Sequence, residues 1–99
     1  MTRDEVIARL KSTEGELRAL GIGELYLFGS FARDEGSAES DVDLLADPTS
    51  SDGGIGFRPY FGAVELIESK LGKRIDLVVR RNLHRIARPT VEREAVKVF

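Results

Sequence analysis

The sequence contains no cysteine and only one histidine, His84. Without cysteine, the chain can form neither disulfide bonds nor thiolate metal sites. No serine has a histidine matched to it, and we assign His84 no catalytic role. Covalent catalysis by a Cys-His or Ser-His arrangement therefore has no support in this sequence.

Long apolar runs are also missing. No run approaches the roughly 20 apolar residues that span a membrane, and the N-terminus lacks the apolar core of a signal peptide. The 99 residues are 41% hydrophobic and 32% charged, which is typical of one soluble globular domain. We therefore expect a single domain over residues 1–99, located in the cytoplasm and without a membrane partner.

Charge is distributed unevenly along the chain, although the net charge is only -2. Residues 1–69 contain 14 acidic and 6 basic side chains, whereas residues 70–99 contain 3 acidic and 9 basic ones. The basic segment would suit nucleotide phosphates, RNA or an acidic partner surface, or it is simply a solvated arginine-rich helix face. The acidic pI of about 5.4 makes direct nucleic-acid binding unlikely as the main function.

Hydrophobic periodicity predicts helices that alternate with strands, which indicates an α/β or α+β fold. Thr2 and Glu5 fit a capping box at the start of a helix over 3–19, with an interruption near Gly15. We predict further helices at 30–36, 57–71 and 89–95, and strands at 25–28, 41–46, 75–79 and 96–99. Residues 48–56 form a polar, glycine-rich loop that either closes over a ligand or merely connects two elements.

An apolar run over residues 25–28 ends in Gly29 and Ser30. A strand that enters a Gly-Ser turn exposes backbone N–H groups, which bind anions such as phosphate. No P-loop lysine follows this turn and no G-x-G-x-x-G follows the strand, so P-loop and Rossmann proteins are disfavoured. A plain helix N-cap serine is the structural alternative for Ser30.

Two aspartates, Asp41 and Asp43, flank Val42 in the next apolar stretch. Side chains alternate across a strand, so both carboxylates point to one face, roughly 7 Å apart. Asp76 is a third acid inside an apolar strand. If its strand neighbours the second one, all three acids face one site that suits two Mg²⁺ ions. Solvated or paired structural acids are the alternative.

Residues 29–33, Gly-Ser-Phe-Ala-Arg, and residues 40–44, Ser-Asp-Val-Asp-Leu, form a pattern of Gly-Ser, about ten residues and Asp-x-Asp. This pattern resembles the minimal nucleotidyltransferases of the DNA polymerase beta nucleotidyltransferase superfamily, and the short chain matches that group. The resemblance implies a small mixed β-sheet with helices packed on one side.

The resemblance also implies an activity: transfer of AMP from ATP to a hydroxyl group, with Mg²⁺ in a two-metal site. It implies that the partner is a HEPN ribonuclease toxin, silenced by AMPylation of a tyrosine. The implied metal-binding and catalytic residues are Asp41, Asp43 and Asp76, with Asp76 also the general base, and the implied cofactor-binding residues are Gly29, Ser30 and Arg33.

Several alternatives stay open. Arg33 lies on the same side as Ser30 and would reach phosphate or pair with a carboxylate. Asp34 stands where the family pattern has glycine, which puts the local turn and the present activity in question. Phe57 and Tyr60 pack in the core or rim, or stack on adenine. Two alternatives to protein AMPylation also stay open. The chain is a non-catalytic antitoxin that acts by contact, or it is a transferase to a small molecule whose acceptor site a partner supplies.

Overall fold

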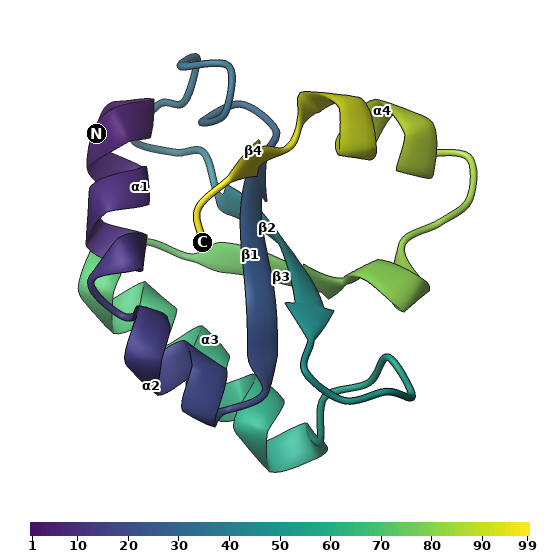
Figure 1. The fold of residues 1–99 in the computed structure, drawn as a ribbon. Coiled ribbons are helices and arrows are strands. Elements are labelled where there is room, and N and C mark those ends of the chain that lie inside the picture. The colour runs from purple at the N-terminus through teal and green to yellow at the C-terminus, as the bar shows by residue number, and fades with distance from the viewer.

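The structure, a computed structural model, describes all residues from 1 to 99 (Figure 1). Four helices, four strands and one 3-10 turn follow one another along the chain. They are α1 (Arg3–Lys11), α2 (Glu14–Ala19), β1 (Ile22–Phe28), β2 (Val42–Pro48), α3 (Phe57–Leu71), β3 (Ile75–Val79), the 3-10 turn (Arg80–Asn82), α4 (Arg88–Glu94) and β4 (Val96–Lys97).

The four strands form one sheet in the order β3-β2-β1-β4. β2 and β3 are parallel, and β1 pairs antiparallel with both β2 and β4. Helix α3 is the crossover that a parallel pair requires. The predicted mixed sheet is confirmed, and its two longest strands, β1 and β2, occupy the centre.

Helices α1, α2 and α3 cover one face of the sheet (Figure 1). Their buried side chains, Val6, Leu10, Leu17, Ala63, Ile67 and Leu71, meet the inward side chains of the strands in a cluster of 17 buried residues. Helix α4 is the exception to the implied one-sided packing. It lies at the opposite face, where Glu92 contacts Arg80 at the end of β3.

The N-terminal helix begins at the predicted capping box. The Thr2 side chain accepts a hydrogen bond from the Glu5 N–H, and Glu5 accepts one from the Thr2 N–H. The predicted interruption is confirmed, and it lies at Ser12 and Thr13, just before Gly15. The Thr13 hydroxyl donates to the Leu10 carbonyl at 2.7 Å and thereby competes with the helical backbone hydrogen bonds.

Helix α3 has the predicted bounds. It ends at Gly72, which adopts a left-handed conformation with φ 68°, as glycine does after many helices. With 15 residues, α3 is the longest helix, and no helix of the structure combines the length and apolarity that crossing a bilayer requires.

The predicted helix over 30–36 is wrong. Residues 30–34 form successive turns instead, and Asp34 has φ 59°, the one positive φ among the non-glycine residues. A left-handed residue stops helix propagation, and aspartate tolerates this conformation better than most residues. The Asp34 carboxylate accepts a hydrogen bond from the Arg3 N–H at 3.0 Å, so the turn is tied to the start of α1. Asp34 thus has a backbone conformation that glycine adopts at little cost.

Candidate active site

The Gly-Ser turn contacts the second predicted aspartate directly. Gly29 has φ 75°, and a Cβ placed on it would overlap Asp43 Oδ2 and lie 3.1 Å from Asp43 Cγ. Only glycine allows both this conformation and this close approach. The predicted anion-binding turn and the predicted metal-binding strand therefore meet at Gly29 and Asp43.

Asp43 and Asp76 are neighbours across the sheet. The parallel register of β2 and β3 pairs Asp43 with Asp76 and Val42 with Ile75. Strands in a sheet lie about 4.8 Å apart, and paired residues point to the same face. The structure thus brings the third acid to the side of the second.

The charges of Asp41 and Arg33 both act on the Asp43 carboxyl. Burial raises the pKa of the Asp43 carboxyl, the negative charges of Asp76 and Asp41 raise it further, and the positive charge of Arg33 lowers it. Like charges on one face disfavour ionisation of the most buried member. A cation bound between Asp41, Asp43 and Asp76 would therefore relieve the repulsion among the three carboxylates.

The three carboxylates do not form a ready-made metal cage. Asp41 lies just before β2 and, like Asp76, is exposed to solvent, and no group of three acidic or histidine side chains converges tightly enough to hold a metal ion as it stands. None of the three forms an ion pair within the chain. Unpaired carboxylate oxygens of this kind are the ligands that Mg²⁺ prefers, so the donor set fits that ion.

Ser30 follows Gly29 in a turn whose backbone is open to a ligand. The Gly29 carbonyl accepts hydrogen bonds from the N–H groups of Ala32 and Arg33, and the Ser30 carbonyl accepts one from Glu35. The N–H groups of Ser30 and Phe31 donate to no backbone carbonyl of the chain, and the Ser30 hydroxyl lies beside them. Adjacent free N–H groups beside a hydroxyl form the kind of concave site that binds phosphate oxygens.

Arg33 is paired with carboxylates rather than free. Its Nε lies 2.9 Å from Glu35 Oε1, and its Nη1 lies 3.2 Å from Glu94 Oε2 in α4. Of the two alternatives for Arg33, pairing with carboxylates is therefore the one observed. The positive charge of Arg33 nevertheless lowers the pKa of Asp43.

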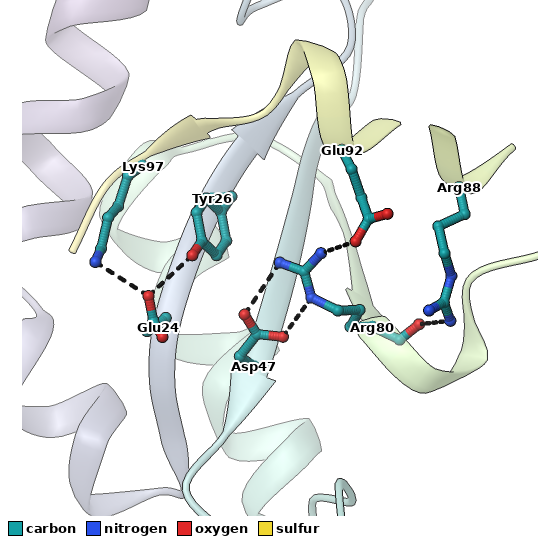
Figure 2. Close-up of polar contacts among 7 residues, drawn as sticks. All are labelled: Glu24, Tyr26, Asp47, Arg80, Arg88, Glu92 and Lys97. Atoms are coloured by element: carbon teal, nitrogen blue, oxygen red, sulfur yellow. Dashed lines mark hydrogen bonds and ion pairs between the residues drawn. The ribbon is translucent and has the colours of Figure 1, made fainter. Parts of the chain in front are cut away.

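An ionic network that the sequence does not predict lies on the same face of the sheet (Figure 2). Arg80 donates to both carboxylate oxygens of Asp47, at 2.6 and 3.0 Å, and to Glu92 of α4. Its guanidinium carbon lies 5.4 Å from the centre of the Tyr26 ring. These carboxylates raise the pKa of Arg80 above its ordinary value. No local pattern signals the network, because its members are far apart in the sequence.

A second missed feature is a cavity of about 530 Å³ at the outer edge of β3. Its lining residues are Gly54, Ile55, Phe57, Tyr60, Leu77, Val78, Val79, Arg81 and Asn82. Tyr60 is half-buried and its hydroxyl donates to the Leu77 carbonyl at 2.7 Å, whereas the Phe57 side chain is 79% exposed. Tyr60 thus packs in the rim, where burial and the negative charge of Asp76 raise the pKa of its hydroxyl.

Comparison with known proteins identifies the family of this chain. The nucleotidyltransferase domain family matches residues 10–98. Protein adenylyltransferase MntA of Thermococcus cleftensis is 35% identical over 99 residues, which cover 99% of this chain and 97% of that protein. The chain belongs to the nucleotidyltransferase domain family and is homologous to MntA, so the predicted enzyme class is confirmed.

Solved structures of other proteins have the same fold as this chain. A structure of a minimal nucleotidyltransferase superposes with a TM-score of 0.82 and 30% identity, over 97% of this chain and 95% of that one. A toxin-antitoxin structure with AMP-PNP superposes with a TM-score of 0.71 and 18% identity, over 90% of this chain and 72% of that one. The first match confirms the minimal nucleotidyltransferase resemblance, and the second supports the fold.

Proposed function

We propose that this nucleotidyltransferase moves AMP from ATP to a hydroxyl group of a partner protein, with Mg²⁺ bound by Asp41, Asp43 and Asp76. The observation that supports this most is the contact of Gly29 with Asp43 while Asp43 is paired in register with Asp76. An anion-binding turn and three unpaired carboxylates then lie within one small region of the sheet, in a chain that works as one domain in the cytoplasm.

Each residue has a defined part in this proposal. The free N–H groups and hydroxyl around Ser30 bind the β- and γ-phosphates, and Gly29 lets them approach the backbone. Arg33 turns to the phosphates when nucleotide binds. Bound Mg²⁺ would supply positive charge to the triphosphate in the transition state. Asp41, Asp43 and Asp76 would hold the metal ions.

The transfer itself is an in-line displacement at the α-phosphorus of ATP. The acceptor oxygen forms a bond to that phosphorus while the bond to the bridging oxygen of pyrophosphate breaks. Asp76, which is exposed at the outer strand of the three, accepts the proton of the attacking hydroxyl. AMP is thereby joined to the acceptor and pyrophosphate is released.

The proposed acceptor is a tyrosine of a HEPN ribonuclease toxin, so that the chain acts as an antitoxin by AMPylation. Two observations favour this acceptor class. The curated relative is named a protein adenylyltransferase, and two structures with the same fold are described as toxin-antitoxin complexes.

Labelled nucleotide tests the proposal. Wild-type protein is incubated with ATP labelled at the α-phosphate, Mg²⁺ and the product of the adjacent gene, beside Asp43→Asn and the exposed control Glu39→Gln. We expect label on the partner with wild type and Glu39→Gln, at least 100-fold less with Asp43→Asn, and none with EDTA. Equal transfer by Asp43→Asn would refute the assignment of the site.

A toxicity assay separates the alternatives. If Asp43→Asn protects cells from the partner as well as wild type does, the chain neutralises by contact and not by AMPylation. If label appears on a small molecule only when the partner is present, the partner supplies an acceptor site instead of the acceptor itself.

A further inference from the structure

We infer that Lys73, in the short link between α3 and β3, is a positioning residue for the candidate site. Its ammonium group holds the turn over residues 37–40 and thereby fixes the place of Asp41, which directly precedes β2. This inference rests on the proposed function, in which Asp41 is a metal ligand. It adds to that function a residue that acts through the ligand and touches neither metal nor nucleotide.

The turn over residues 37–40 is closed by its own hydrogen bonds. The Ser40 N–H donates to the Ser37 carbonyl at 3.1 Å, and the Ser37 N–H donates to the Ser40 hydroxyl, also at 3.1 Å. The two hydroxyl oxygens lie 3.0 Å apart. Because Asp41 is the next residue in the chain, the orientation of this turn decides where the chain enters β2 and where Asp41 lies.

Lys73 attaches this turn to the β3 side of the sheet. Its Nζ donates to the Ala38 carbonyl at 2.9 Å and to the Ser37 carbonyl at 3.3 Å. The Lys73 side chain is half-buried and forms no ion pair. An ammonium group has three N–H donors and no acceptor. Lys73 therefore fastens two backbone carbonyls of a distant segment and does not serve as the counter-ion of a carboxylate.

Asp41 is held by its two neighbours in the chain. Ser40, before it, belongs to the turn that Lys73 binds. Val42, after it, donates its N–H to the Arg74 carbonyl at 3.1 Å, and Arg74 directly follows Lys73. The Asp41 side chain is exposed and forms no ion pair of its own. Its place relative to β3 thus depends on the backbone contacts that Lys73 and Arg74 make.

The same lysine is also tied to the Gly-Ser turn. Phe31 directly follows Ser30 and is 2% exposed, and Lys73 Nζ lies 5.4 Å from the centre of its ring. A cation over an aromatic face at this distance is attracted to it. A Cβ on Gly36 would lie 2.5 Å from Phe31 Cε1, so this glycine lets the loop pack against the ring. Lys73 therefore contacts both segments that carry the predicted ligands outside its own strand.

The sign of the effect separates positioning from charge. Lys73 carries a positive charge and lies three residues before Asp76, at a site proposed to bind cations. By Coulomb's law alone, removal of this charge would strengthen cation binding. If Lys73 acts by holding Asp41, its removal weakens cation binding instead. The direction of the change therefore distinguishes the two roles.

The test measures binding of Mn²⁺, as the probe for the magnesium site, to the full chain without nucleotide. Electron paramagnetic resonance reports the free Mn²⁺, and competition by Mg²⁺ shows that both ions share the site. The variants are Lys73→Met and Lys73→Gln, which remove the ammonium group, and Lys73→Arg, which keeps the charge. The matched control is Lys70→Met, at an exposed lysine in the last turn of α3. Amide hydrogen exchange is followed in the same proteins.

We expect Lys73→Met and Lys73→Gln to raise the Kd for Mn²⁺ at least fivefold. Exchange at the Ser40 and Val42 amides should become at least tenfold faster, while exchange in α1 stays constant. Lys73→Arg should stay within twofold of wild type, because a guanidinium also donates to two carbonyls and stacks on an aromatic ring. Lys70→Met should match wild type.

Transfer of AMP to the partner gives a further measurement. In Lys73→Met the half-maximal rate should need at least fivefold more Mg²⁺, whereas the rate at saturating Mg²⁺ should stay close to that of wild type. A general loss of stability would lower the melting temperature without this change in the Mg²⁺ requirement.

An unchanged or lower Kd for Mn²⁺ in Lys73→Met and Lys73→Gln would overturn the inference, and so would an equal loss in Lys70→Met. Both outcomes leave the proposed function intact, because wild type still transfers AMP. Conversely, if no protein accepts AMP while the two variants lose Mn²⁺ affinity as expected, the role of Lys73 stands and the proposed transfer fails alone. A wild-type chain that binds no Mn²⁺ would refute the metal site, and with it the role of Lys73.

Discussion

Arg33, in the turn after β1, forms an ion pair with Glu94 in α4, 61 residues later, with Nη1 at 3.2 Å from Oε2. Under the proposed function, Arg33 must leave this ion pair, and its contact with Glu35, before it binds a nucleotide phosphate. The proposal therefore makes Glu94 a competitor of the nucleotide for Arg33, and the ion pair joins α4 to the turn after β1.

Replacement of Glu94 by glutamine should therefore strengthen nucleotide binding. Half-exposed ion pairs contribute up to about 1 kcal/mol, so we expect the Kd for an ATP analogue to fall about two- to fivefold at low salt. Isothermal titration calorimetry would measure the change. As a control, Glu65→Gln alters an exposed acid of α3 and should leave the Kd unchanged. An unchanged Kd in Glu94→Gln would mean that Arg33 does not leave Glu94 for phosphate.

The raised pKa of Asp43 predicts how stability changes with pH. In the folded chain this carboxyl takes up a proton more readily than at its ordinary value of 3.8, so ionisation costs folding stability as pH rises above that value and through the folded pKa. Without divalent cations, Asp43→Asn should therefore be more stable than wild type at pH 7, and the difference should vanish below pH 3.8.

Urea denaturation in EDTA at both pH values would measure this difference. Under the proposed metal site, addition of Mg²⁺ should raise the melting temperature of wild type but not that of Asp43→Asn, because a ligand of the folded state stabilises it. A lower stability of Asp43→Asn at pH 7 would contradict the electrostatic account of the site.

Asp34 has a left-handed backbone conformation with φ 59°. Asp34→Ala should cost about 1–2 kcal/mol of unfolding free energy, because alanine tolerates this conformation poorly and loses the hydrogen bond from Arg3. Asp34→Gly should stay within about 0.5 kcal/mol of wild type, because relief of backbone strain offsets the lost hydrogen bond. Equal losses in chemical denaturation for both variants would show that the conformation is not the deciding factor.

Arg80 joins β2, β3 and α4 through its planar guanidinium (Figure 2). Arg80→Lys keeps the charge but cannot make the two-point contact with Asp47 and the contact with Glu92 together, so we expect a loss of about 1 kcal/mol. Amide hydrogen exchange should become faster in α4 and stay constant in α1. Arg85→Lys, at an exposed arginine without an ion pair, is the control. If Arg85→Lys also makes amide exchange in α4 faster, the Arg80 contacts are not what stabilises α4.

The elements that follow local rules were predictable. The spacing of apolar residues in 57–71, followed by Gly72, gave α3 its bounds, and the acid inside the apolar strand 75–79 singled out Asp76. Local rules were weaker where a side chain competes with the backbone. The hydroxyls of Ser12 and Thr13 moved the break in the first helix, and the left-handed Asp34 replaced a predicted helix by turns.

The sequence by itself determined the strand-turn unit around Gly29, the Asp-x-Asp spacing and the family, because these depend on residues within a few positions of one another. Only the tertiary structure decided that Asp76 is paired with Asp43, that α4 joins Arg33 and Arg80, and that a cavity follows Asp76 along β3. Strand order and register arise from packing between distant segments, where many pairings satisfy the same alternation of apolar and polar residues and only the complete core selects one.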